Sequence, residues 1–556
     1  MKLIRTLLAA FFLTQQVWFA ELNAAARFNA EALDGEIIEN AELLRLPGLS
    51  LAVVHDGAII HRLNVGFADL ESKKPIADDS IFWLASITKS FSAVMLMQYE
   101  SDGRLSLNDP LIRYPFASVG FFPQRVRADV RLKHAISHTS EAIPGTTFVY
   151  HGGRYNFVYG VFQQMSGLKF PDAYHHELST RITQPLGLEA TLPGFPSTNS
   201  VSLRARIVMP YGFDSSKQAF TVNRDAQNPG AAYPASGLLS SIKDLAAYTT
   251  ALDEERLLKK DAYTKMTTPF VNNRGEDMPY GMGWFTQTFA GVPLHWAYGL
   301  GDSDSAILLR VPTRRLSLIV LCNSSFATAP SRLGGGNALN SPFVVAFLKS
   351  FVFEKELDKD RINYGAKIAD ISTDLNRHLA KSSHPIYAEE LLSQALTRTF
   401  AERTFTLSSA QGELLTELLY RTNPDTFKKY DPTVSYLLSQ HTGSKLDEAA
   451  ELAEKSYRAV GRFHPWIVHA LAKRFEAKGQ KDKALEYFHT LADTAGFEEQ
   501  GETVDACAVL GKYYTEQKQF DKAREYLWRA LVYKRQVGGN DSAILRQLED
   551  VNSLDH

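Results

Sequence analysis

The chain has 556 residues, of which 45% are hydrophobic and 22% are charged, as in an ordinary globular protein. This length exceeds what one hydrophobic core normally supports, so we expect two or three domains. The 60 Lys and Arg residues nearly match the 62 Asp and Glu residues, leaving a net charge of -2. Such a balance provides no electrostatic attraction to nucleic acid or to an anionic membrane surface, and we expect neither as a partner.

The first 24 residues have the features of a secretory signal peptide. Lys2 and Arg5 form a short positive region, residues 7–12 are apolar, and small residues at Ala20 and 24–26 offer cleavage sites. The apolar stretch is too short and too interrupted for a membrane span, although an N-terminal amphipathic helix of the folded domain is an alternative. We therefore expect a periplasmic or secreted protein that keeps no stable membrane span after cleavage.

The chain contains two cysteines, Cys322 and Cys507, in segments that we assign to different domains. Cys322 lies in an apolar run typical of a strand, so we expect a buried thiol rather than half of a disulfide. Two cysteines cannot form a zinc site alone, and no His-Glu-x-x-His sequence occurs. We expect neither a metal nor another cofactor.

Two segments near the N-terminus predict a strand pair followed by a helix. Apolar runs at 51–54 and 59–61 flank Asp56-Gly57, a tight-turn pair, and this pattern predicts a β-hairpin. Residues 90–99 contain neither Pro nor Gly and are mostly apolar. They predict a largely buried helix.

A second strand pair is expected some two hundred residues later. The apolar runs 305–311 and 316–321 are separated by a turn signal that begins at Pro312. Strands at both ends of a segment, with helices between them, indicate an α/β domain whose sheet is closed by segments distant in sequence. We place this domain at residues 28–355.

The rest of the chain has a different character. Pro and Gly become scarce, charged residues become more frequent, and helical spacing dominates. We expect a helical linker region at 356–440 and an array of helical repeats at 441–545.

The repeats show in residues that recur 39 positions apart, such as Leu471 with Leu510 and Ala484 with Ala523. This pattern resembles tetratricopeptide repeats, in which small residues let two helices pack closely. A plain helical bundle is the alternative. Two clear units are too few for independent stability, so we expect them to dock on the preceding helices. We expect the repeats either to bind a peptide or protein partner on a concave surface or to pack on the hydrolase domain and shape its cleft.

A serine and a lysine stand three positions apart at the start of the predicted helix, as Ser86-x-x-Lys89. Residues with this spacing lie on one helix face, so the lysine amine can reach the serine hydroxyl. A serine hydroxyl is a poor nucleophile until a neighbour takes its proton, and burial lowers the pKa of a lysine towards the range where it can do so. Backbone N–H groups at the helix N-terminus can also stabilise an oxyanion.

The residues around this pair make the motif more specific. They include Pro47-Gly48, His55-Asp56-Gly57, Asp102-Gly103-Arg104, Ser137-His138-Thr139, Pro234-Ala235-Ser236-Gly237 and Tyr280-Gly281-Met282-Gly283-Trp284. Together these stretches resemble the family of class C-like β-lactamases, D-alanyl-D-alanine carboxypeptidases and carboxylesterases, over about residues 30–355. The resemblance implies an antiparallel sheet flanked by helices, with an added helical subdomain, and a catalytic Ser86 and Lys89.

The same resemblance implies a tyrosine that exchanges a proton with the serine, in the pattern Tyr-x-Asn. The matching residues here are Tyr150, His151 and Gly152, so the tyrosine is present and glycine replaces the asparagine. In the family that asparagine binds the acyl amide of the substrate and helps to hold the lysine. Tyr155-Asn156 follows too late for the pattern, and we interpret it as helix.

The third family motif is Lys-Thr-Gly or His-x-Gly, whose cation binds a substrate carboxylate. Counting back from the strand at 305–311 places it on Ala297, Tyr298 and Gly299, with alanine where the cation belongs. Reading the strand two residues earlier puts His295 in that role. We prefer the register that begins at Ala297, and the register that begins at His295 remains open.

Two functions from different classes follow from these residues. The first is an exported serine hydrolase that forms an acyl-enzyme on Ser86 with an ester or a peptidoglycan-type, D-alanyl-D-alanine-like amide, its substrate being a small molecule or a peptide. The loss of both substrate-holding groups, at Gly152 and Ala297, favours neutral esters or an unusual peptide. The second is a catalytically weakened hydrolase fold that serves as a binding module, with the repeats recruiting a protein.

Overall fold

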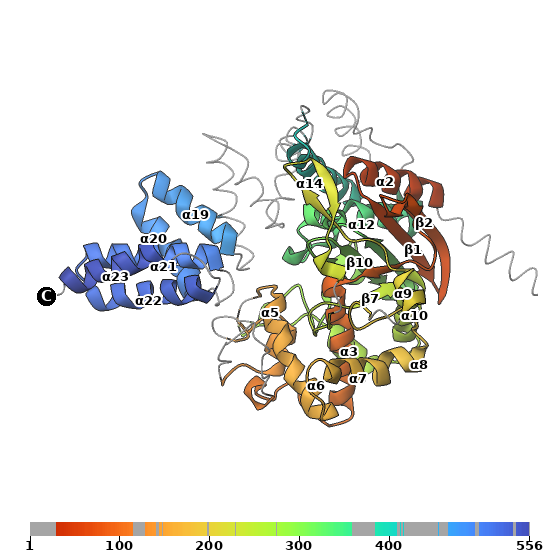
Figure 1. Cartoon of the computed structure of the whole chain (residues 1–556), viewed down its shortest axis with the longest axis horizontal. Coiled ribbons are helices and arrows are strands. Elements are labelled where there is room, and N and C mark those ends of the chain that lie inside the picture. The colour runs from red at the N-terminus through yellow and green to blue at the C-terminus, as the bar shows by residue number, and fades with distance from the viewer. Residues whose placement is uncertain are drawn as a thin grey trace, which may run out of the picture.

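The structure is a computed structural model, and it describes the chain in segments. These are residues 29–114, 128–140, 144–146, 148–196, 200–227, 230–273, 275–357, 384–407, 465–494, 500–536 and 541–554, together with the single residues 412, 415 and 454. The predicted signal peptide (1–24) and most of the predicted helical linker (356–440) lie outside them. Figure 1 shows a body of strands and helices formed by the first part of the chain, and a separate group of helices at its C-terminal end.

A seven-stranded sheet forms the centre of the first part, in the order β3-β2-β1-β11-β10-β9-β8. Every neighbouring pair in it with a described register is antiparallel. The strands are β1 (Gly48–His55), β2 (Ala58–Asp69), β3 (Lys74–Pro75), β8 (Phe285–Phe289), β9 (Val292–Leu300), β10 (Ser305–Val311) and β11 (Leu316–Cys322).

Both predicted strand pairs are present. Asp56 and Gly57 join β1 to β2 with φ values of 48° and 82°, the left-handed conformation that a tight hairpin turn requires. The predicted turn at Pro312 joins β10 to β11. Strand β1 also pairs with β11 in the register Leu51 to Val320, which confirms that distant segments close the sheet.

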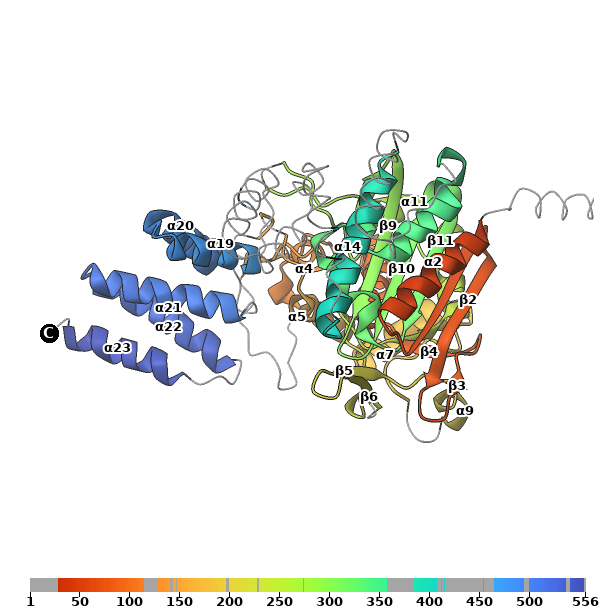
Figure 2. The same cartoon turned by 90° about the horizontal axis from the view of Figure 1, so that it is seen from above.

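Helices α2 (Ala30–Leu43), α12 (Pro342–Phe347) and α14 (Ile386–Thr404) contact one another, and Figure 2 shows α2 and α14 lying across the sheet. A buried ion-pair cluster joins the group. Lys349 Nζ lies 3.0 Å from a carboxylate oxygen of Glu36 on α2 and 2.6 Å from one of Glu390 on α14. The segment after residue 384 is thereby attached to the N-terminal helix.

Helix α3 (Thr88–Ser101) is the predicted buried helix, and almost all of its side chains are inaccessible to solvent. It contacts α7 and α11 of the helical subdomain. The other helices of this part are α4 (Leu132–Ile136), α5 (Gly152–Tyr155), α6 (Tyr159–Ser166), α7 (Asp172–Leu178), α8 (Gln184–Leu186), α9 (Val201–Arg204), α10 (Ile242–Asp253) and α11 (Lys260–Thr267). Two small sheets pair β4 (Ile81–Trp83) with β7 (Leu239–Ser241) and β5 (Tyr211–Asp214) with β6 (Ala219–Val222).

The described residues from 465 onward are helical, in α19 (Pro465–Ala477), α20 (Lys481–Thr494), α21 (Gln500–Glu516), α22 (Phe520–Gln536) and α23 (Ser542–Leu554). Helices α19 and α20 contact each other, as do α21 and α22. The turn within each pair has a residue with positive φ, Gly479 at 71° and Lys518 at 58°, and these two are also 39 positions apart. An α/β domain with an antiparallel sheet and flanking helices, followed by an all-helical region, agrees with the predicted fold class.

Both cysteines are buried and free. Among the described residues, no helix combines the length and the apolar character that a membrane crossing requires. In the same part of the chain, no three His, Cys, Asp or Glu side chains are arranged to hold a metal ion.

Candidate active site

Ser86 stands in a 3₁₀ turn (Ala85–Ile87) that leads directly into α3. The residue before it, Ala85, has φ of 41°, a conformation that non-glycine residues adopt rarely and that is often found at functional sites. On the other side, β9 comes close to this turn, since a β-carbon on Gly299 would lie 2.3 Å from the carbonyl oxygen of Leu84. A glycine at 299 therefore lets β9 lie directly against the backbone that carries the serine.

Lys89 occupies the first turn of α3, and its amine faces Ser86. Nζ lies 2.7 Å from the Ser86 hydroxyl oxygen and donates a second hydrogen bond of 3.2 Å to the carbonyl oxygen of Ala235. The lysine is only 1% exposed, and burial lowers its pKa to about 7. No described carboxylate forms an ion pair with it, so nothing holds the amine in its charged form. Near neutral pH a substantial fraction is the free base.

Tyr150 adjoins both residues. Its phenol is close enough to the Ser86 side chain for that side chain to act on the pKa of the phenol, and its ring centroid lies 4.9 Å from Lys89 Nζ. Burial raises the pKa of Tyr150 above its usual value, so the phenol is neutral at physiological pH. Aromatic rings enclose it, with centroids 4.5 Å away at His138, 5.2 Å at Phe285 and 5.5 Å at Tyr298. The structure thus brings together the three predicted catalytic side chains.

Gly152 lies beside the lysine, where the family pattern has asparagine. A β-carbon there would be 3.9 Å from Lys89 Nζ and 4.0 Å from the β-carbon of Ala235, which are ordinary contacts. The glycine therefore leaves open space next to the amine rather than relieving a clash.

Asn156, one helical turn after Gly152, was missed as a site residue because we interpreted it only as helix. Its Oδ1 accepts a 2.9 Å hydrogen bond from the N–H of Ala235, the residue whose carbonyl accepts from Lys89. Positions four apart on a helix share one face. The four-residue spacing between Gly152 and Asn156 is therefore the sequence signal that could have identified Asn156 as a site residue. Ala235 links the two side chains through its own backbone.

The predicted third motif lies on β9, and its residues face different neighbours. Ala297 is buried and pairs with Leu308 of β10, Tyr298 packs its ring on Tyr150, and Gly299 contacts the backbone before Ser86. His295 instead hydrogen-bonds the Tyr263 hydroxyl at 2.9 Å, and burial lowers its pKa to about 4. Of these four residues, Tyr298 contacts Tyr150, and Gly299 contacts the backbone of Leu84, two positions before Ser86.

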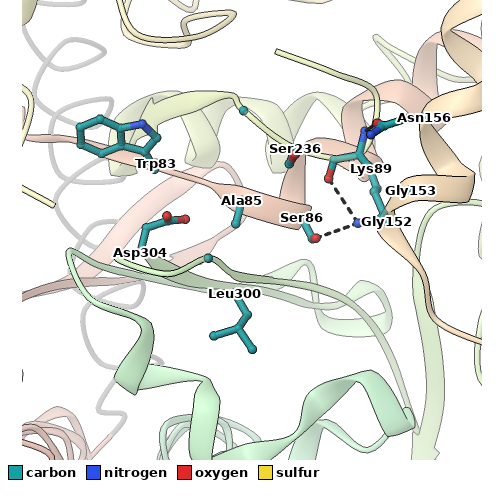
Figure 3. Close-up of a pocket in the computed structure, with 13 residues that line it drawn as sticks. Trp83, Ala85, Ser86, Lys89, Gly152, Gly153, Asn156, Ser236, Leu300 and Asp304 are labelled. Carbon is teal, nitrogen blue, oxygen red and sulfur yellow. Dashed lines mark hydrogen bonds between the residues drawn. The ribbon is translucent and has the colours of Figure 1, made fainter. Parts of the chain in front are cut away.

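A cavity of about 440 Å³ opens at Ser86. Figure 3 shows Trp83 and Asp304 on one side of the serine, and Lys89, Gly152 and Asn156 on the other. Among the described residues that line it, Lys89 is the one basic side chain and Asp304 the one acidic side chain. The full lining is Trp83, Ala85, Ser86, Lys89, Gly152, Gly153, Asn156, Ala235, Ser236, Gly237, Leu300, Gly301 and Asp304.

Comparison with known proteins shows which family the chain resembles. Residues 37–337, more than half of the chain, match the family model described as beta-lactamase. A D-aminopeptidase of Gluconobacter oxydans is 24% identical over 307 residues, covering 50% of this chain and 56% of the relative. A β-lactamase of Escherichia coli is 24% identical over 271 residues, covering 44% of this chain and 67% of the relative.

The chain spans 56% of that D-aminopeptidase and 64% of the flp protein of Staphylococcus aureus. Among solved structures, the octameric penicillin-binding protein homologue from Pyrococcus abyssi is similar, with a TM-score of 0.48, 23% identity, and coverage of 58% of this chain and 78% of that one. On the match of residues 37–337 to the family model, the chain belongs to the β-lactamase family.

Proposed function

We propose that this protein is a serine hydrolase that forms an acyl-enzyme on Ser86 with an ester or amide substrate. The observation that carries the proposal is the 2.7 Å contact between Ser86 Oγ and the buried amine of Lys89, whose pKa of about 7 allows it to act as a base. The match to the β-lactamase family supports the same chemistry.

In the proposed first step, neutral Lys89 takes the proton of the Ser86 hydroxyl as Oγ attacks the substrate carbonyl carbon. The developing oxyanion lies near the N-terminal end of α3, where the helix dipole favours negative charge. Tyr150, beside Ser86, passes a proton to the leaving group as the tetrahedral intermediate collapses. A water molecule then attacks the ester on Ser86 and gives a proton to the Tyr150 phenolate. Ser86 Oγ leaves with the proton held by Lys89, which releases the acid and restores all three side chains.

The substrate is proposed to be an ester or a peptide-like amide with no requirement for a carboxylate. Ala297 supplies no cation on β9, and no basic side chain other than Lys89 is among the described lining residues. The similarity to a D-aminopeptidase supports an amide of a D-amino acid as one class to test. Hydrolysis of D-alanyl-D-alanine peptides far faster than of short-chain esters would contradict the proposed preference.

A second candidate function is a binding module with weakened catalysis. The glycine at 152 and the alanine at 297 favour it, because both replace groups that hold substrate in the family.

We also propose that the protein is exported, because residues 1–24 have the features of a signal peptide. We further propose that the paired helices from 465 onward are tetratricopeptide-like repeats that contact a protein partner. The shared 39-residue offset of Gly479 and Lys518 supports the repeats.

A fluorophosphonate probe tests the hydrolase directly, because it labels an activated serine covalently. We expect wild-type labelling to disappear in Ser86→Ala. Ser236→Ala is a matched control, since Ser236 is a second serine in the lining of the same cavity, and this variant should still be labelled. Absence of labelling by this probe and by a fluorescent penicillin in the wild type would favour the binding module.

A further inference from the structure

An acidic side chain lines the cavity, and one of its two oxygens has no hydrogen-bond partner among the described residues. Asp304 lines the cavity, and its Oδ2 atom is inaccessible to solvent and has no hydrogen-bond partner among the described residues. In Figure 3 it lies on the same side of Ser86 as Trp83, with Ala85 between it and the serine. A carboxylate removed from water normally has a cation or several donors beside it, and here the described chain supplies neither.

The loop between β9 and β10 is built to place this carboxyl group. Gly301 N–H donates a 2.9 Å hydrogen bond to the backbone carbonyl of Asp304, which closes a tight turn. A β-carbon on Gly301 would lie 2.4 Å from Asp304 Oδ1, so the glycine leaves the space that the carboxyl occupies. The turn therefore leaves room for the carboxyl group at this edge of the cavity.

An aromatic ring adjoins this side of the cavity. Trp83 is partly exposed and lines the same cavity, while its ring stacks on Phe195 with centroids 5.7 Å apart and planes 7° apart. The stacking holds the indole ring in place. The face of a tryptophan ring attracts cations, and its combination with a carboxylate is a common way of binding an ammonium group.

We propose that Asp304 and Trp83 form a subsite that binds a primary ammonium group of the substrate beside Ser86. The inference rests on the proposed function, because it names the substrate class of the same cavity: esters or amides that carry a free amine. It also accounts for the charge of the cavity. The carboxylate of Asp304 on this side of the lining repels a substrate carboxylate and attracts an amine.

Burial and the nearby Asp302 raise the pKa of Asp304 to about 7. An incoming ammonium group opposes both effects, because a nearby positive charge favours the ionised carboxylate. The ligand would thus supply the partner that the carboxyl group lacks in the free protein.

Turnover of matched substrates tests the subsite. The probes are phenylalanine 7-amido-4-methylcoumarin, as both enantiomers, and the same compounds acetylated on nitrogen. In a second pair, 2-aminoethyl butyrate and ethyl butyrate, the amine is on the alcohol that leaves when Ser86 is acylated. We expect kcat/KM to be at least tenfold higher for the free amine in one of the pairs, and this ratio to fall below about threefold in Asp304→Asn.

Asp302→Asn is the matched control, because Asp302 is an exposed carboxylate two residues away that does not line the cavity. It should keep or increase the amine preference, because without the Asp302 charge the pKa of Asp304 is lower and its carboxylate is more fully ionised. Equal kcat/KM for amine and acetylated forms in both pairs, or a preference that survives in Asp304→Asn, would overturn the subsite.

Binding separates this inference from the proposed function. In Ser86→Ala, calorimetry should show phenylalanine amide binding at least tenfold more tightly than N-acetylphenylalanine amide, and Ser86→Ala combined with Asp304→Asn should lose the difference. If Ser86-dependent ester hydrolysis occurs but the two ligands bind alike, the subsite is wrong and the hydrolase stands. If the amine binds selectively but no Ser86-dependent turnover of any probe occurs, the subsite stands and the hydrolase fails.

Discussion

Gly299 and Leu84 are in direct backbone contact, and no larger residue fits at 299 without displacing one of the two chains. An added β-carbon would lie 2.3 Å from the Leu84 carbonyl oxygen and 3.1 Å from the Ala85 side chain. The contact joins the strand that forms one wall of the cavity to the turn that presents Ser86. The position of the serine relative to β9 therefore depends on the absence of one methyl group.

Gly299→Ala should consequently displace the serine and lower fluorophosphonate labelling of Ser86 at least tenfold, with a loss of stability of roughly 1–3 kcal/mol. Gly212→Ala is the matched control, because the nearest atom to a β-carbon there is 3.9 Å away and the backbone is not in the left-handed region. Labelling rates and urea unfolding measure the two effects. Wild-type labelling of Gly299→Ala would show that the contact does not position Ser86.

The pKa of Lys89 predicts how acylation depends on pH. Because burial lowers that pKa to about 7 and the neutral amine is the base, kcat/KM should rise as pH increases through about 7 and then level off. Lys89→Met should lower kcat/KM by about 10²–10⁴-fold and abolish this rise. Lys265→Met, an exposed lysine paired with Glu100, is the control and should keep it. A wild-type profile that is flat between pH 5 and 9 would contradict the assigned role.

The same shift makes stability depend on pH in a defined direction. The unfolded lysine has its ordinary pKa of 10.5 and the folded one about 7, so between these values the unfolded state binds more protons. The contribution of Lys89 to the free energy of unfolding should therefore increase as pH rises from about 7 to 10.5. Comparison of wild type with Lys89→Met by urea unfolding across this range isolates the effect, and parallel stability curves would contradict it.

Tyr150→Phe keeps the ring in its aromatic surroundings and removes only the hydroxyl beside Ser86. We expect the fold to persist and the acylation rate to fall by roughly 10²–10⁴-fold, measured by stopped-flow mixing with a chromogenic ester. Tyr298→Phe provides the comparison, since its ring packs on Tyr150 without a described bond to the serine. A smaller loss in Tyr150→Phe than in Tyr298→Phe would remove Tyr150 from the proton path.

His295 offers a test of the two registers for the third motif. Its imidazole bonds Tyr263 and lies outside the cavity lining, so His295→Asn should leave Ser86 labelling within about twofold of wild type while lowering the melting temperature. A loss of turnover with unchanged stability would instead support His295 as the substrate-binding residue of the motif.

The local features of this fold could be predicted from sequence, while the cavity lining depends on tertiary packing. Two features depend only on residues close in sequence: the turn pair Asp56-Gly57 and the spacing of Ser86 and Lys89. The hairpin and the catalytic motif could therefore be predicted from the sequence. Asn156 and Asp304 carry no motif of their own. Asn156 reaches the site through a hydrogen bond to Ala235, 79 positions away, and Asp304 through a loop that Gly301 permits.

The pairing of β1 with β11 has a consequence for how this chain matures. Strand β1 hydrogen-bonds its hairpin partner on one edge, but its other edge is completed only by residues 316–322, more than 260 positions later. A contact of such high sequence separation forms late, because a long loop must be closed before it is gained. During synthesis the N-terminal strands can pair locally, yet the sheet cannot close until nearly the whole domain has been made. Until residues 316–322 have been made, the edge of β1 that pairs with β11 has no partner strand.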